Sequence, residues 1–353
     1  MDFGVLSIFQ NYRDEQDDGE TMRGELALAK LADALGYHSY WATEHHFFGY
    51  SMCPDNLQWL AQVAAATPRI RLGTGAVIVP WNDPYRVAAK MALFDQQSGG
   101  RALLGLGRGL SKREYERFGI PMDEARWRFD EGSALILEAL NKGFFEADTE
   151  HFRHPRAELR PRPVRGFDDR VFSIGVSPDS AVQAAVLGAK LMCLAQQPWQ
   201  VFRQQALEPY QERWRALRDT PPPAPFCGQL VFCDEDGDRA RELGAKYVKE
   251  YFFTVVEHYE IGGAHFAGTK GYEHYATAAQ AISAMGLDAM AEMYAGVNTF
   301  GTPEEVVEQL REQKRILGVD HDVLVIPKYG SMTQAEAEAS LRTFAEKVVP
   351  AFR

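Results

Sequence analysis

The sequence predicts an α/β fold of the (β/α)8 TIM barrel type, and three observations support this prediction. Short β-like runs alternate with longer helical runs along the chain, which gives eight strand–helix units. The runs interpreted as strands are almost continuously apolar, as expected for a parallel sheet buried on both faces. A length of 353 residues is normal for one such barrel with insertions, so we expect a single domain over residues 1–353.

The first four units have the clearest patterns. The predicted strands are 3–9, 38–43, 70–80 and 101–109, and the helices that follow them are 24–36, 54–67, 83–100 and 126–143. In the first helix, Leu28, Leu31 and Leu35 recur at helical spacing and Gly36 marks the C-terminal end.

The second half repeats the alternation less regularly. The predicted strands are 170–176, 191–195, 225–234 and 322–327, and the helices are 177–189, 199–217, 238–260 and 333–349. A further helix is expected over 301–318, with Thr302 as N-cap, Pro303 in the first turn, Glu305 completing a capping box and Gly318 at the end.

Two segments are predicted to be insertions. Residues 146–170 are rich in Arg and Pro, which favours an ordered but irregular loop between the fourth and fifth units. Residues 261–297 are rich in Gly, Ala and aromatic residues. Long excursions in such folds usually serve function, so we expect an active-site flap there.

Composition restricts the class of protein. Apolar residues make up 46% of the chain and charged residues 25%, as in soluble globular proteins. The net charge of −11 disfavours nucleic acid or an anionic membrane as the main partner. The four cysteines have no paired spacing, which favours free buried thiols in a reducing compartment. With no membrane-length apolar stretch and no N-terminal signal pattern, we expect a cytoplasmic protein.

Chemically informative residues follow four consecutive predicted strands. They are Glu44–His46 after the second strand, Gly75–Ala76 late in the third, Gly107–Leu110 after the fourth and Ser177–Ser180 after the fifth. The C-terminal ends of barrel strands form the active-site face, and consecutive strands are neighbours. These stretches should therefore line one continuous arc of a site.

Arg108 is the candidate anion-binding residue. It lies between Gly107 and Gly109, whose spacing matches neither a dinucleotide fingerprint nor a P-loop. The glycines would let a ligand approach the backbone closely. A guanidinium at this position can hold a phosphate through two hydrogen bonds.

The adjacent serines have two interpretations. Ser177 precedes Pro178 at the start of a predicted helix, and Ser180 follows on the first turn, so a plain helix cap is the ordinary interpretation. Beside Arg108, the same hydroxyls and N–H groups would form a phosphate cradle. Asp179 complicates this second interpretation, because its carboxylate competes for the same helix end.

His45 and His46 are adjacent on an extended segment and should point in opposite directions. They seldom bind one ion in that arrangement, and no third ligand at an evident spacing supports zinc, so we expect no metal. A histidine that faces the pocket can serve as a general base or hydrogen-bond donor. A polar residue at a loop mouth is the alternative.

Three stretches together resemble a known family. "WATEHHFF", "LGTGAVIVPWNDPYRVAAKMALFDQQSGGRALLGLGRGL" and "FGTPEEVVEQL" are similar to the bacterial luciferase-like, flavin-dependent monooxygenases, and to the light-emitting α subunit in particular. The resemblance covers nearly the whole chain, is densest over 40–145 and is weak over 261–297.

The resemblance implies a TIM barrel that takes reduced FMN from a separate flavin reductase. The flavin would react with O2 to a C4a-(hydro)peroxide and pass one oxygen atom to a small, fairly apolar organic substrate. Two alternatives remain open. One is a deazaflavin (F420)-dependent oxidoreductase of the same fold, and the other is a non-catalytic flavin-binding subunit.

The resemblance also implies roles for individual residues. His45 would be the catalytic base, with Glu44 beside it to orient the loop. The residues implied to bind the cofactor are Gly75, Ala76, Arg108, Gly109, Leu110, Ser177, Ser180 and Tyr251. Among these, Gly75–Ala76 matches a non-proline cis peptide beneath the flavin ring.

Some positions depart from the light-emitting subunit. Gly107 replaces a cysteine and Ser111 replaces a tyrosine, which predicts a roomier pocket and a substrate other than a long-chain aldehyde. We expect Phe9, Phe47 and Trp81 to line that pocket. The helix at 54–67 is unusually apolar for an outer barrel helix, so we expect a homodimer or a heterodimer with a related chain.

Overall fold

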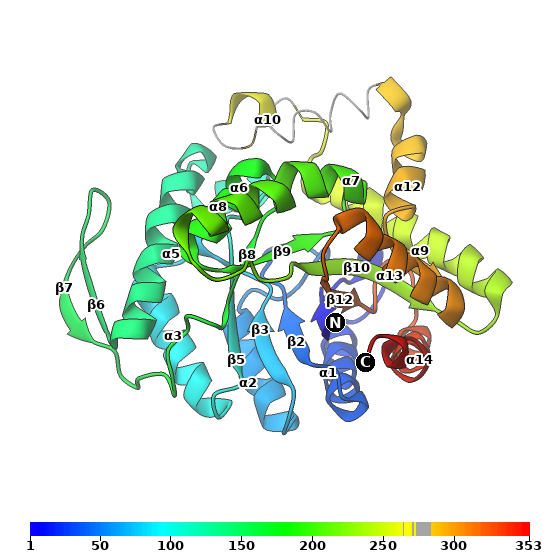
Figure 1. The fold of residues 1–353 in the computed structure, drawn as a ribbon, viewed down its shortest axis with the longest axis horizontal. Helices are drawn as coiled ribbons and strands as arrows, with labels where there is room; N and C mark the ends of the chain where they lie inside the picture. The colour runs from blue at the N-terminus through cyan, green and yellow to red at the C-terminus, as the bar shows by residue number, and fades with distance from the viewer. Residues whose placement is uncertain (264, 270–271, 273–283) are drawn as a thin grey trace.

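In the computed structural model, eight parallel strands close into a barrel with helices on its outside (Figure 1), which confirms the predicted (β/α)8 architecture. The order around the barrel is β1-β2-β3-β5-β8-β9-β10-β12, and β12 pairs with β1 to complete the ring. Their bounds are β1 Phe3–Ser7, β2 Ser39–Ala42, β3 Arg71–Thr74, β5 Ala102–Gly107, β8 Val171–Ile174, β9 Lys190–Leu194, β10 Phe226–Cys233 and β12 Asp322–Ile326. The structure describes residues 1–263, 265–269, 272 and 284–353.

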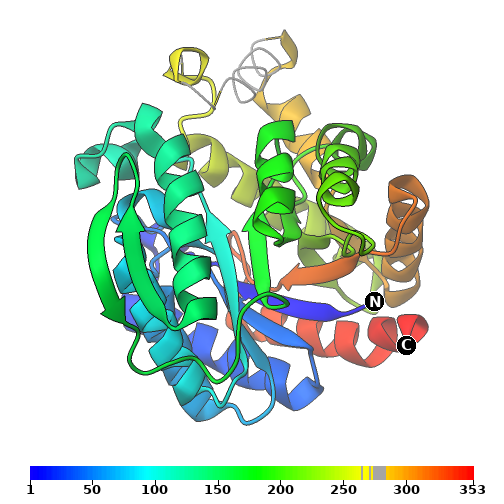
Figure 2. The ribbon, with the colours of Figure 1, turned by 60° about the vertical axis from the view of Figure 1, so that its left-hand side comes forward.

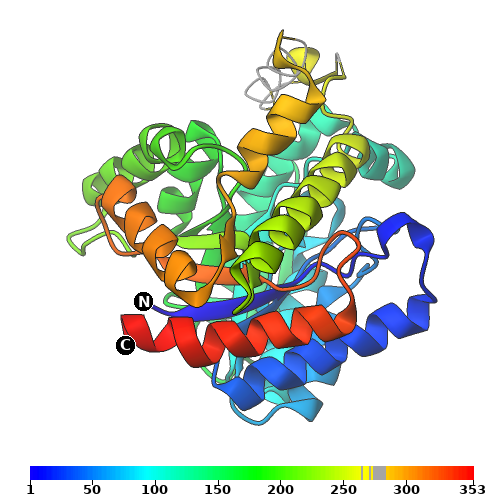
Figure 3. The ribbon, with the colours of Figure 1, turned by 90° about the vertical axis from the view of Figure 1, so that its right-hand side faces the viewer.

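The helices surround the barrel. Their bounds are α1 Asp18–Leu35, α2 Asn56–Ala66, α3 Pro84–Gln97, α4 Lys112–Phe118, α5 Ala125–Lys142, α6 Pro178–Leu187, α7 Trp199–Phe202, α8 Glu208–Leu217, α9 Gly237–His258, α10 His265–Gly268, α12 Leu287–Ala295, α13 Pro303–Leu317 and α14 Gln334–Thr343. Helices α1 and α14 come from opposite ends of the chain and lie side by side (Figure 3). The barrel thus draws on both ends of the sequence, which agrees with the predicted single domain, although the domain count stays a prediction.

Helix ends follow the predicted capping chemistry. Thr302 accepts from the backbone N–H of Glu305, and the Glu305 side chain accepts from the backbone N–H of Thr302, so the capping box at α13 is confirmed. Gly318 ends this helix at a φ of 72°, a left-handed conformation that glycine adopts at little cost. Gly36 ends α1 in the same way, with a φ of 77°.

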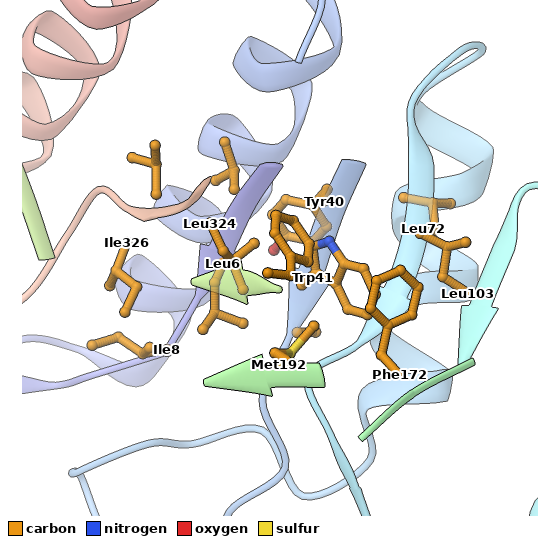
Figure 4. Close-up of a cluster of buried hydrophobic side chains, with 14 of the residues drawn as sticks. Leu6, Ile8, Tyr40, Trp41, Leu72, Leu103, Phe172, Met192, Leu324 and Ile326 are labelled. Carbon is orange, nitrogen blue, oxygen red and sulfur yellow. The ribbon is translucent and has the colours of Figure 1, made fainter. Parts of the chain in front are cut away.

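Large apolar side chains fill the barrel interior below the C-terminal ends of the strands (Figure 4). Trp41 is fully buried and makes edge contacts with the rings of Phe172 and Phe226, with ring centroids 4.7 and 5.5 Å away. A Cβ at Gly73 would come within 2.2 Å of the Trp41 ring, so only glycine leaves room for this indole. The packed interior fills the barrel on the side of the strand N-termini and leaves the C-terminal end of the strands for a site.

Residues 146–170 differ from the prediction. Instead of an irregular loop, β6 (Phe144–Asp148) and β7 (Arg153–Glu158) form an antiparallel hairpin that stands outside α5 (Figure 2). Burial of Phe145 and Ala147 on one face of β6 explains the hairpin, because alternate residues of a strand share a face. The Arg- and Pro-rich composition of the segment hides this alternation.

The strand predicted over 70–80 is divided into two, since β3 ends at Thr74 and β4 (Val77–Ile78) pairs separately with β5. The short strand β11 (Thr299–Gly301), which pairs with the end of β10, was not predicted. The predicted flap at 261–297 lies partly outside the described residues, since 264, 270–271 and 273–283 are not described.

Two further expectations can be compared with the structure. The four cysteines are free and buried, as predicted. Within the described ranges, no helix has both the length and the apolar character needed to cross a membrane.

Candidate active site

One cavity opens at the C-terminal end of the barrel strands. Its empty space amounts to about 1200 Å³, a volume that includes open solvent at the mouth. Every site residue predicted from the sequence lines this cavity: Glu44, His45, Gly75, Ala76, Arg108, Gly109, Leu110, Ser177, Ser180 and Tyr251. Residues scattered over more than 200 positions of sequence therefore meet in one place, although their individual roles stay predictions.

The floor beside β3 and β5 carries little side-chain bulk. The Gly75–Ala76 peptide bond is cis, as the family resemblance implied. The side chain of Asn56 donates to the Ala76 carbonyl at 3.1 Å. A Cβ at Gly107 would lie 3.2 Å from the Ala76 Cβ and 3.0 Å from the Ile78 side chain. Glycine at 107 is therefore favoured by close packing against Ala76 and Ile78, and Gly75, Ala76 and Gly107 together line the cavity with no side chain larger than a methyl group.

Arg108 and the first turn of α6 border another part of the cavity. The guanidinium of Arg108 lies over the ring of Tyr272, 4.3 Å from its centroid. Tyr272 donates its hydroxyl hydrogen to the Gly109 carbonyl at 2.8 Å. These contacts hold the loop after β5 beside the cavity and keep a cation there.

The serines of α6 form a capping box. The Ser177 hydroxyl accepts from the backbone N–H of Ser180, the two hydroxyl oxygens lie 2.9 Å apart, and Ser180 Oγ accepts from the backbone N–H of Ser177 at 3.1 Å. The plain-cap interpretation is therefore confirmed. Both side chains also line the cavity, so the cap does not exclude a second role toward an anion.

Asp179 is not among the residues that line the cavity. Its side chain is 75% exposed, and its carboxylate lies 3.9 Å from the guanidinium of Arg126. Arg126 itself makes an ion pair with Asp130 at 3.3 Å. The complication raised by Asp179 is thus weakened, because a cation from α5 stands beside its charge.

His45 and His46 point in different directions, as predicted for neighbours on an extended segment. His45 lines the cavity, whereas His46 packs against Trp81 and Phe118, with ring centroids 5.9 and 4.8 Å away. His45 Nε2 lies 3.3 Å from the Tyr259 hydroxyl. His45 is therefore the histidine of the pair that could meet a ligand.

Glu114 is the main residue that sequence reasoning missed. Its carboxylate oxygens lie 3.2 and 3.3 Å from His45 Nδ1, and one of them accepts from the backbone N–H of His46 at 2.6 Å. Burial alone would raise the pKa of Glu114, but the neighbouring His45 and His258 outweigh it and hold the pKa well below its usual range. An ionised, buried carboxylate thus fixes one side of the His45 ring.

His258 stands behind this pair. Its Nε2 lies 3.8 Å from a Glu114 oxygen, and its ring stacks on Tyr50 at 4.2 Å between centroids. Burial lowers the pKa of His258. The donor atoms of His45, Glu114 and His258 lie within 4.8 Å of one another, so folding supplies the third potential ligand that the sequence spacing did not reveal. His45 and Glu114 already bond to each other, and the expectation of no metal stays a prediction.

Glu44 connects the loop after β2, through hydrogen bonds, to β4 and to the segment that follows β4. Its carboxylate accepts from the backbone N–H of Ile78 at 3.1 Å, from Trp81 Nε1 at 2.7 Å and from Asn82 Nδ2 at 2.9 Å. These bonds agree with the expectation that Glu44 orients the loop.

Several pocket expectations need correction. Trp81 lines the cavity as predicted, but Phe9 is fully buried against Trp59 and Phe47 is 55% exposed at the surface. Ser111 is buried at the start of α4 and is not among the residues that line the cavity. Of the two departures noted in the sequence, only the one at Gly107 borders the open space.

Comparison with curated proteins finds relatives that match either half of this chain or nearly all of it. The first curated relatives include an uncharacterised protein of Sinorhizobium fredii that is 32% identical over 182 residues, and that match covers 50% of this chain and 53% of the relative. The chain therefore spans about half the length of such relatives. The alkanal monooxygenase alpha chain of Aliivibrio fischeri is 23% identical, with 95% of this chain and 96% of the relative covered.

Solved structures agree with the fold. The monooxygenase RslO1 from Streptomyces bottropensis has a TM-score of 0.82 at 26% identity, with both chains covered completely. The oxygenating constituent of 3,6-diketocamphane monooxygenase from Pseudomonas putida, in complex with FMN, has a TM-score of 0.78 at 18% identity, covering 99% of this chain and 98% of that one. A coenzyme F420-dependent reductase from Methanopyrus kandleri has a TM-score of 0.71 at 19% identity, covering 100% and 99%. The last two show the fold alone.

A family model described as luciferase-like monooxygenase matches residues 1–321. This match includes seven of the eight barrel strands and all the residues predicted from the sequence to form the site. The chain therefore belongs to the luciferase-like monooxygenase family.

Proposed function

We propose that this protein is the oxygenase component of a two-component flavin-dependent monooxygenase. It would bind reduced FMN delivered by a separate flavin reductase and use O2 to oxygenate a small, fairly apolar organic molecule. The observation that carries the proposal is that one cavity is lined by a cation and a helix N-terminus, by residues with little side-chain bulk, and by a histidine held by a carboxylate.

The phosphate of FMN would lie beside Arg108 and the first turn of α6. Arg108 contributes a guanidinium, which suits a phosphate through charge and paired hydrogen bonds. Ser177 and Ser180 contribute hydroxyls at the positive end of the helix dipole. The carboxylate of Asp179 lies near Arg126, which reduces its repulsion of a phosphate here.

The flavin ring would occupy the floor formed by Gly75, Ala76 and Gly107. These three residues line the cavity and none carries a side chain larger than a methyl group, so this part of the lining leaves room for a planar ring and the residues present fit FMN. When bound and reduced, FMN supplies the two electrons that activate O2.

His45 would hold and move a proton at the reacting end of the cavity. Glu114 accepts at Nδ1, so a proton at that atom is stabilised and Nε2 is turned toward the cavity and Tyr259. A buried carboxylate that orients an imidazole and stabilises its protonated form is a recurring arrangement in general acid–base catalysis. Glu114 would act through His45 and is therefore a positioning residue.

The proposal is tested by the equilibrium binding of cofactors under anaerobic conditions. We expect reduced FMN to bind and a deazaflavin of the F420 type to bind more weakly, because Arg108, Ser177 and Ser180 are the set that the family resemblance links to the FMN phosphate. Arg108→Ala should weaken FMN binding by roughly 10- to 100-fold, as expected for loss of a charge-assisted phosphate contact.

Arg117→Ala is the matched control, because Arg117 lies on the exposed side of α4 and does not line the cavity. Tighter binding of the deazaflavin would favour the oxidoreductase alternative. Binding of neither cofactor would contradict the proposal, whereas binding of reduced FMN with no effect on its reaction with O2 would favour the non-catalytic flavin-binding subunit.

A further inference from the structure

The same cavity carries information about its substrate. We propose that it accepts a neutral, flat aromatic molecule with a ring hydroxyl, that is, a phenol, with the hydroxyl directed toward His45. The inference rests on the proposed function, because it assigns the part of the cavity that FMN would leave free.

The strand order separates the two ends of the cavity. In the closed ring, β5 and β8 lie opposite β12 and β1. Arg108 and Ser177 follow β5 and β8, whereas Ile8 and Ile326 line the cavity where β1 and β12 end. Helix α9 reaches this second side, since Thr254 accepts from the Gln10 side chain at 2.9 Å. The phosphate end and the α9 side are therefore on opposite sides of the barrel mouth.

Aromatic rings form the wall on the α9 side. Tyr50 packs edge-on against Tyr259 with 5.5 Å between ring centroids, and nearly parallel to Tyr251 with 5.9 Å. His45 meets Tyr50 edge-on at 5.3 Å. All four residues line the cavity. Flat aromatic ligands gain specific ring contacts on such a wall beyond the burial of their area, whereas an alkyl chain gains only the burial.

This wall also carries hydroxyl groups. The hydroxyl oxygens of Tyr50 and Tyr251 lie 2.9 Å apart, and that of Tyr259 lies 3.3 Å from His45 Nε2. Burial raises the pKa of Tyr251 to about 12, so this hydroxyl keeps its proton at neutral pH. We therefore assign Tyr251, which the family resemblance linked to the cofactor, to the substrate side. The hydroxyls and His45 form a polar patch on an otherwise apolar wall, which suits one oxygen substituent on an aromatic ring.

The charges of the described lining residues exclude a charged substrate on this side. Glu44 is held by three donors, and Glu114 by His45 and the backbone of His46. Arg108 lies at the opposite end. A substrate cation or anion buried against Ile8 and the tyrosines would lack a compensating charge from the described lining, which is costly in an apolar site.

The reaction expected for such a substrate is ring hydroxylation. His45 takes the proton of the phenolic hydroxyl, which makes the ring carbon next to the C–O bond electron-rich. One oxygen atom of O2 forms a new C–O bond at that carbon, and the hydrogen displaced there leaves as a proton. The other oxygen atom leaves as water, and the two electrons required come from reduced FMN.

The test measures the binding of ligands to the FMN-loaded protein, and the change in the flavin absorbance spectrum reports the binding. The probes are 2-naphthol, the anion 2-naphthoate and the alkyl aldehyde decanal. We expect 2-naphthol to bind at least about tenfold more tightly than either of the others. Tyr251→Phe and Tyr50→Phe should each weaken naphthol binding about fivefold and leave decanal binding unchanged, because each removes one hydrogen bond.

Tyr85→Phe is the control, because Tyr85 packs on Phe145 and is not among the residues that line the cavity. The Tyr85→Phe protein should therefore bind all three probes as the unmodified protein does. Equal or tighter binding of decanal, or Phe variants that bind naphthol normally, would overturn the substrate assignment. FMN binding is measured first, so failure of the proposed function appears as absent FMN binding. Failure of this inference appears only as the wrong ligand preference on a protein that binds FMN.

Discussion

The contact between Glu114 and His45 leads to a quantitative prediction. Glu114→Gln removes the negative charge but keeps an oxygen for the backbone N–H of His46, which the carboxylate now accepts at 2.6 Å. The substitution changes the interaction with His45, because the two Glu114 carboxylate oxygens lie 3.2 and 3.3 Å from His45 Nδ1. A hydrogen bond to a charged group contributes about 1.5–3 kcal/mol and a neutral one about 0.5–1.5 kcal/mol, so protonated His45 should lose about 1–2 kcal/mol.

That loss corresponds to a roughly 5- to 30-fold change in a rate that depends on the His45 proton. The assay mixes protein-bound reduced FMN with oxygenated buffer and follows the appearance of oxidised flavin. We expect a proton held by His45 to delay the unproductive release of hydrogen peroxide. We therefore expect oxidised flavin to appear about 5- to 30-fold sooner in Glu114→Gln, toward the behaviour of His45→Ala.

The control is Glu116→Gln, which makes the same chemical change on the same helix. Glu116 is exposed and pairs with Lys112, so its loss should leave the reaction unchanged. A correctly folded Glu114→Gln protein with normal FMN affinity and unaltered kinetics would refute the role assigned to this pair.

Four other predictions follow from the structure. Because the pKa of Glu114 is lowered on folding, its stabilisation is present above the ordinary carboxyl pKa and is lost as pH falls. Thermal denaturation at a series of pH values from about 5 to 3 should show a shallower loss of stability in Glu114→Gln than in the unmodified protein; parallel curves would contradict this. Asp95 and Arg170 form a fully buried ion pair at 2.5 Å, so Asp95→Ala should cost about 3–5 kcal/mol of unfolding free energy in chemical denaturation; a cost below about 1 kcal/mol would refute the pair's importance. Treatment with EDTA should leave the rate of flavin oxidation by the protein unchanged. If EDTA changes this rate and added Zn²⁺ restores it, His45, Glu114 and His258 would be indicated as a metal site. Analytical ultracentrifugation at micromolar concentration should show a dimer, as predicted from the apolar character of helix α2. Sedimentation as a monomer would refute this prediction.

The barrel could be predicted from sequence because its signals are local. Continuous apolar strands such as 225–234 and capped helices such as 301–318 carry their own pattern in neighbouring residues. The hairpin of β6 and β7 and the short strand β11 could not be recognised in the same way. Their stability depends on contacts with distant elements, as in the burial of Phe145 against Tyr85 of α3.

The site could be predicted in part because barrel geometry brings the ends of neighbouring strands together. This rule located His45, Arg108 and Ser177 without any contact being known. It could not locate Glu114 or Tyr259, which lie on or after helices and reach His45 from 69 and 214 positions away in sequence. A carboxylate in the first turn of the helix after the Arg108 loop was a usable signal, but a tyrosine is too common in barrel packing to indicate a site.

The central claim is that this cavity controls the reaction of reduced FMN with oxygen. The most direct measurement is rapid mixing of the anaerobic complex of protein and reduced FMN with oxygenated buffer, compared with free reduced FMN under the same conditions. We expect the protein to delay the appearance of oxidised flavin, His45→Ala to shorten the delay and Arg108→Ala largely to abolish it through loss of bound flavin. Oxidation at the rate of free flavin, with FMN shown to be bound, would show that the cavity does not control this reaction.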